Sequence, residues 1–142
     1  MSISQLVKKV LERFDIGDEY LVVSGGVMEV LGIRKAADID ILISARTFKE
    51  LAKHPDLNRK DERLLSVEVD GREVELFVFW EINGMSGDMI YENFKDRFFV
   101  VQGIKFINLE EVLKWKQDRG RQKDQADIEL IVEYLDQNPQ NN

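Results

Sequence analysis

The sequence has 142 residues and a mass of 16.6 kDa, which is the size of one domain. Because it contains no cysteine and one histidine, His54, it cannot form disulfides, thiolate metal sites or sites with several histidines. Any bound metal would need oxygen ligands, which favours magnesium, manganese or calcium. The 27 acidic and 20 basic residues give a net charge of -7, which argues against nucleic-acid binding over the whole surface.

The sequence also lacks the signals of membrane insertion and export. No segment approaches the roughly 20 consecutive apolar residues that a membrane span needs. The first residues reach Lys8 and Lys9 quickly and then alternate in charge, which is not the pattern of a signal peptide. We therefore expect a cytoplasmic protein with no membrane partner.

The first half of the chain alternates predicted helices and strands. In chain order, we predict a helix over residues 3–14, a strand over 20–23, a helix over 27–31, a strand over 38–43 and a helix over 46–53. The helices are indicated by apolar residues at helical spacing, and the strands by apolar or alternating runs rich in Val and Ile. Ser44 is predicted to cap the third of these helices.

The second half is predicted to contain two hairpins and two helices. In chain order, we expect a polar loop over 56–63, strands over 64–69 and 72–80, a turn-rich loop over 83–88, strands over 98–101 and 104–107, a helix to about 118, a basic link over 119–123 and a helix over 125–135. Asp70-Gly71 between two strand-like runs is a strong hairpin signal. Asn108 is predicted to cap the first of the two helices, with Glu111 reaching back to it.

This order of elements predicts an α/β (α+β) fold, in which a small mixed β-sheet is flanked by helices. The sequence shows no internal repeat, low-complexity linker or domain boundary. We therefore expect a single domain over residues 1–137, followed by a frayed tail over 138–142.

Ser24-Gly25-Gly26 lies between a predicted strand and a predicted helix. Glycines at such a place allow a ligand to approach the backbone closely, and the start of the helix offers free N–H groups to a phosphate. A tight turn from strand to helix explains an isolated Gly-Gly pair more simply.

Acidic residues follow the predicted strands in a pattern that fits metal binding. Asp38 and Asp40 are two residues apart on a strand, so they point to the same face. Glu75 lies in an apolar run of another strand and needs a partner there, either a basic side chain or a metal shared with the two aspartates. Carboxylates on two neighbouring strands could hold magnesium, but an acidic face exposed to solvent would look the same in the sequence.

Taken in order, these motifs resemble the nucleotidyltransferase superfamily that includes DNA polymerase beta, in particular its small single-domain members of abortive-infection and toxin–antitoxin type. The family pattern is a strand, a Gly-Gly or Gly-Ser pair, a short helix, an Asp-x-Asp motif on the next strand and a third acid on a neighbouring strand. The matching residues are Ser24-Gly25-Gly26, Asp38-Ile39-Asp40 and Glu75, and in the C-terminal part Lys116, Arg121-x-Lys123-Asp124 and Asp127. The resemblance covers about residues 20–135 and implies a nucleotidyltransferase-like fold.

The resemblance implies transfer of a nucleoside monophosphate from a nucleoside triphosphate such as ATP to a hydroxyl of a protein, an RNA or a small molecule. The implied catalytic residues and ligands of two Mg²⁺ (or Mn²⁺) ions are Asp38, Asp40 and Glu75. The implied nucleotide-binding residues are Ser24, Gly25, Gly26, Lys116, Arg121 and Lys123. For each of the last three, a solvated basic helix end is the simpler explanation. We expect Asp124 and Asp127 to cap the last helix.

Two alternatives stay open. In the family pattern the third acid is usually Asp, and here it is Glu75. This departure fits a catalytically inactive member that acts as a binding module, either an antitoxin-like partner of a toxin or a nucleotide sensor. In the other alternative the protein is unrelated to this family, and its acidic strand is simply solvated.

Overall fold

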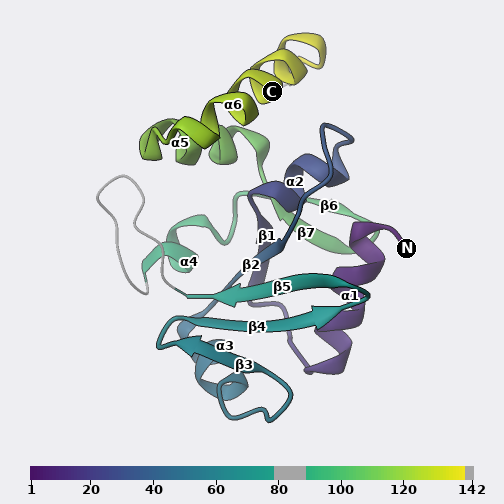
Figure 1. Cartoon of the computed structure of the whole chain (residues 1–142), viewed down its shortest axis with the longest axis vertical. Helices are drawn as coiled ribbons and strands as arrows, with labels where there is room; N and C mark the ends of the chain where they lie inside the picture. The colour runs from purple at the N-terminus through teal and green to yellow at the C-terminus, as the bar shows by residue number, and fades with distance from the viewer. Residues whose placement is uncertain (79–88, 140–142) are drawn as a thin grey trace.

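A seven-stranded sheet runs through the molecule in the order β3-β4-β5-β2-β1-β7-β6 (Figure 1). The computed structural model describes residues 1–78 and 89–139. The strands are β1 (Tyr20–Val23), β2 (Ile39–Ile43), β3 (Asn58–Asp61), β4 (Leu64–Val69), β5 (Arg72–Phe77), β6 (Phe98–Val101) and β7 (Ile104–Ile107). Strand β2 pairs parallel with β5 and antiparallel with β1, and β1 pairs parallel with β7. The sheet is therefore mixed, which confirms the predicted α/β class.

Helices flank this sheet and close one end of the molecule. They are α1 (Ile3–Arg13), α2 (Gly25–Val30), α3 (Ala45–Leu51), α4 (Met89–Phe94), α5 (Leu109–Arg119) and α6 (Gln122–Gln137). Helices α1 and α2 pack on each other and on β7, and α2 also contacts β1, β2 and α5. Helices α5 and α6 pack together at one end of the molecule, and β3 lies at the opposite end (Figure 1). None of the helices in the described ranges is long and apolar enough to cross a membrane.

Both predicted hairpins are present, because their turn residues adopt the left-handed backbone that two-residue hairpin turns need. Asp70 and Gly71 have φ angles of 51° and 80° between β4 and β5. Gln102 and Gly103 have φ angles of 51° and 80° between β6 and β7. Ser44 also caps α3 as predicted, since its hydroxyl accepts a hydrogen bond from the amide of Thr47.

Several boundaries differ from the prediction. The expected loop over 56–63 contains β3, whose four residues are all exposed and polar and therefore carry no apolar pattern. Helix α6 begins at Gln122 instead of residue 125, and α4 was not predicted. Asn108 is the N-cap of α5, but its side chain makes no capping hydrogen bond. The Glu111 carboxylate accepts a hydrogen bond from Arg97, and the Asn108 amide donates to the carbonyl of Arg97, so the predicted contact between Glu111 and the Asn108 amide does not form. The predicted strand over 72–80 ends at Phe77.

Parts of three predictions lie outside the described residues. They are the end of the 72–80 strand at residues 79–80, the turn-rich loop over 83–88 and the end of the tail at residues 140–142.

The core forms where α1 and α2 cover the central strands. Val22, Ile41 and Phe106, from three neighbouring strands, are all fully buried. The close approach of α2 to β1 requires a glycine at position 26, because a Cβ there would lie 2.6 Å from Cγ1 of Val22. Packing between this helix and strand therefore fixes the position of the loop at Ser24, where the pocket described next begins.

Candidate active site

Carboxylates gather on one face of the sheet where β2 and β5 run side by side. The parallel register places Asp40 beside Glu75 and Ile39 beside Val74. Since alternate residues of a strand share a face, Asp38 and Glu73 continue the same row. Carboxylate oxygens of Asp38, Glu73 and Glu75 all lie within 4.8 Å of one another. Two of the predicted acids, Asp38 and Glu75, are thus brought together with Glu73. The third, Asp40, lies beside Glu75 in the register and outside this group of three.

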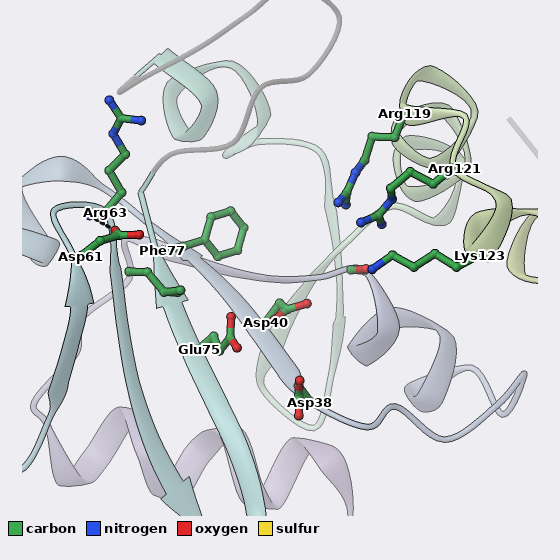
Figure 2. Close-up of a pocket in the computed structure, with 11 residues that line it drawn as sticks. Asp38, Asp40, Asp61, Arg63, Glu75, Phe77, Arg119, Arg121 and Lys123 are labelled. Carbon is green, nitrogen blue, oxygen red and sulfur yellow. Dashed lines mark hydrogen bonds between the residues drawn. The ribbon is translucent and has the colours of Figure 1, made fainter.

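These acids form one wall of a cavity of about 440 Å³. The cavity is lined by Ser24, Asp38, Asp40, Asp61, Arg63, Leu64, Glu75, Phe77, Arg119, Arg121 and Lys123. Figure 2 shows Asp38, Asp40 and Glu75 below the open space, with Arg119, Arg121 and Lys123 reaching toward it from the helical side. Arg63 points away from the acids in the same view, and its amide donates a hydrogen bond of 2.7 Å to Asp61. The cavity therefore has an acidic wall and a basic wall.

The carboxylates of the acidic wall repel one another electrostatically. Burial, together with the negative charges of Glu75 and Asp38, raises the pKa of Asp40 to about 6. The positive charges of Lys116 and Arg119 offset only part of this rise. Clustered carboxylates that repel one another favour either a proton or a bound cation. Their oxygen atoms are the ligands that Mg²⁺ and Mn²⁺ prefer, so the donor set fits these ions.

Lys60, on β3, forms ion pairs with two carboxylates of this row, Glu73 and Glu75. Its ammonium group contacts Glu73 and lies 3.6 Å from Oε1 of Glu75. The hydrogen bond to Glu73 raises the pKa of Lys60. Glu75 therefore has a basic partner, yet it also lines the cavity together with the two aspartates.

The basic wall comes from the junction between α5 and α6. Arg119 is the last residue of α5, and Gly120 then turns the chain with a left-handed φ of 60°. Arg121 is the N-cap of α6 and donates hydrogen bonds of 2.8 and 3.0 Å to Asp124. Burial and the neighbouring charge of Arg121 lower the pKa of Arg119. This junction turns Arg119, Arg121 and Lys123 to the cavity.

Lys116, a predicted substrate contact, does not reach the cavity. Its side chain is 8% exposed, and its ammonium group lies 3.0 Å from Asp127 and 3.7 Å from Asp124. Asp127 also accepts hydrogen bonds of 2.6 and 2.8 Å from Arg34. The prediction that Asp124 and Asp127 cap the last helix is wrong, because both are buried inside α6 in this ion-pair network.

In the Ser24-Gly25-Gly26 motif, the serine lines the cavity and the two glycines are buried. Ser24 lines the cavity and has a left-handed φ of 55° at the start of α2. Gly25 and Gly26 are buried, and a Cβ at Gly25 would lie 3.0 Å from Cβ of Ala36. Close packing thus explains both glycines. Their amides are the first of α2, where N–H groups have no carbonyl partner within the helix.

Sequence reasoning missed several residues of the cavity. Arg119 was placed in the basic link without a role of its own, and Asp61 and Arg63 were placed in a loop. The only signal for Arg119 is its position directly before Gly120, which predicts a helix end but not the direction of the turn. Phe77 is recognisable only as the end of an apolar strand.

Comparison with known proteins identifies the fold. No family model matches the sequence, and no curated protein matches it. Among solved structures, TM1012 from Thermotoga maritima, assigned as a nucleotidyltransferase, matches with a TM-score of 0.57 and 16% identity, over 94% of this chain and 92% of that one. ANT(2″)-Ia, solved in complex with adenylyl-2″-tobramycin, matches with a TM-score of 0.55 and 11% identity, over 94% of this chain and 87% of that one. The chain therefore has a nucleotidyltransferase-like fold.

Proposed function

We propose that this protein transfers a nucleoside monophosphate from a nucleoside triphosphate to a hydroxyl acceptor and releases pyrophosphate. The observation that carries the proposal is the cavity with two oppositely charged walls on a nucleotidyltransferase-like fold. Asp38, Asp40 and Glu75 lie on one wall, and Arg121 and Lys123 lie on the other. A triphosphate with its divalent cation carries both signs of charge and matches both walls.

Asp38, Asp40 and Glu75 are the proposed ligands of Mg²⁺ or Mn²⁺. When bound, such ions stabilise the developing charge on the attacking and leaving oxygens. The raised pKa of Asp40 and the negative charges of Glu75 and Asp38 that contribute to it support a cation there. Glu73, whose oxygen lies within 4.8 Å of those of Asp38 and Glu75, extends the acidic wall.

The remaining groups have separate roles in the proposed reaction. Ser24 and the first amides of α2 bind the phosphates distal to the reacting phosphorus. Arg121 and Lys123 neutralise charge on the leaving pyrophosphate. The acceptor oxygen forms a bond to the α-phosphorus, the bond from that phosphorus to the bridging oxygen breaks, and Glu75 accepts the proton of the hydroxyl.

The decisive test uses the double variant Asp38→Asn with Asp40→Asn, which keeps the shape of both side chains and removes both charges. In the wild-type protein, Mg²⁺ with ATP is expected to raise the melting temperature, because a ligand bound only to the folded state stabilises it by about 2.7 kcal/mol at 100 times its Kd. In the double variant this ligand-dependent rise should vanish, while the metal-free melting temperature should increase as repulsion is relieved.

The control is Asp56→Asn, which removes an exposed carboxylate that lies 3.6 Å from Arg13 and outside the cavity. This variant should respond to Mg²⁺ and ATP as the wild type does. A double variant that still responds normally would disprove the assignment of the site.

Transfer is then measured with ATP labelled at the α-phosphate, against protein, RNA and small-molecule fractions as acceptors. Nucleotide binding without transfer to any of these would favour the binding module.

A further inference from the structure

We propose that Lys60 is an internal cation that occupies Glu75 when no divalent ion is bound and competes with that ion for the carboxylate. This inference rests on the proposed function, because Glu75 is one of the proposed metal ligands. Lys60 would thereby set the concentration of divalent ion at which the site fills.

The position of Lys60 is unusual for a residue that contacts β5. Strand β4 lies between β3 and β5 in the sheet, so the lysine side chain spans β4 to reach Glu73 and Glu75. Ser66, a small residue of β4, is directly opposite Glu75 in the register. A long side chain therefore meets little obstruction on this face of the sheet.

The register between β3 and β4 is irregular at this lysine. Arg59 pairs with Leu65, and Asp61 pairs with Leu64, so β3 advances by two residues where β4 advances by one. Lys60 is the additional residue of β3 at this irregularity. Bulges of this kind bend a strand and change the direction of a side chain, and they are frequent at sheet edges and next to active sites.

The contact between Lys60 and Glu75 is close, and the lysine is partly open to solvent. The ammonium group lies 3.6 Å from Oε1 of Glu75, so a divalent cation on that carboxylate would experience direct repulsion from Lys60. The lysine side chain is 42% exposed, and ion pairs of such exposure are weak because water screens them. Because its stem is long and flexible, Lys60 can move into solvent when the ion arrives.

The test is a titration of the full chain with Mn²⁺ alone, measured by isothermal titration calorimetry. Lys60→Met removes the charge and keeps the apolar stem, and its half-saturating Mn²⁺ concentration should be roughly threefold to tenfold below that of the wild type. Lys60→Arg keeps a cation and should stay within about twofold of the wild type. Lys53→Met, at an exposed lysine of another segment, is the matched control and should also stay within about twofold.

A second measurement separates competition from a purely structural role. Without metal, Lys60→Met should unfold at slightly lower urea concentration than the wild type, because Glu73 and Glu75 lose their counter-charge. With saturating Mn²⁺, the order should reverse. A variant that is less stable under both conditions, or binds Mn²⁺ no more tightly than the wild type, overturns the inference about Lys60 while the proposed function stands. If neither the wild type nor any variant binds Mn²⁺, both proposals fail together.

Discussion

Replacing Lys116 with methionine is expected to destabilise the protein through the ion-pair network that joins α5, α6 and the loop before β2. Lys116 is buried and lies between the carboxylates of Asp124 and Asp127. Methionine has a similar length, so the substitution removes the charge without opening a large cavity. The two carboxylates then remain buried with one cationic partner fewer.

The size of the effect follows from the partners that remain. Removing one member of a buried ion pair usually costs about 3–5 kcal/mol, because an uncompensated charge stays in the interior. Here Asp127 keeps its two hydrogen bonds from Arg34, and Asp124 keeps its two from Arg121. We therefore expect a smaller loss of about 2 kcal/mol in the free energy of unfolding, and a fall in melting temperature of about 6–10 °C for a chain of this size.

Urea unfolding followed by circular dichroism at neutral pH measures this loss directly. The control is Lys114→Met, because Lys114 is largely exposed and forms a surface ion pair of 3.7 Å with Glu111. We expect this variant to lose less than about 0.5 kcal/mol in the free energy of unfolding. If Lys116→Met lost no more than this control, the buried network would not hold the two helices together, and the reasoning from burial would be refuted.

Two further predictions concern the metal-free protein. The folded-state pKa of Asp40 is raised from its ordinary value of 3.8 to about 6, so its ionisation costs stability progressively as the pH rises between these two values. The cost reaches about 2–3 kcal/mol at pH 7, and stability measured by urea unfolding in chelator should therefore rise as the pH falls from 7 toward 4. Asp40→Asn should lose that part of the pH dependence, and an unchanged profile would contradict the assigned repulsion. Gly26→Ala places a Cβ 2.6 Å from Cγ1 of Val22 and should cost about 1–3 kcal/mol in the same assay, whereas Gly17→Ala, which meets nothing within 4 Å, should be nearly neutral.

Local sequence signals predicted the elements that local chemistry decides. Strand β1 and the β6–β7 hairpin have the predicted bounds, because their apolar runs and turn residues lie next to one another in the chain. Strand β3 was missed for the opposite reason: its polar residues are held by backbone pairing with β4, and an edge strand exposed on every side has no apolar periodicity. Its detection would have required knowledge of its partner.

The site also contains features that local sequence predicts and features that depend on distant residues. The Asp-x-Asp spacing predicts a shared face for Asp38 and Asp40 from the geometry of a single strand. The role of Lys116 could not be predicted, because its network depends on Arg34 and Asp127, which are 93 residues apart in the sequence. A basic residue before a helix end looks the same in sequence whether it binds substrate or a buried carboxylate. Long-range ion pairs therefore decide which lysines and arginines remain available to a ligand.

The ion pair between Arg121 and Asp124 bears on how opposite charges stay apart in the cavity. Arg121 lines the same cavity as Asp38 and Asp40, yet its guanidinium is bonded to Asp124. Asp124 in turn lies 3.7 Å from the ammonium group of Lys116, so Arg121 is held by a buried carboxylate that has a second cationic partner. These two hydrogen bonds restrain the guanidinium from forming a direct ion pair with Asp38 or Asp40. In the proposed reaction, the space between Arg121 and these acids accommodates a triphosphate with its metal ions.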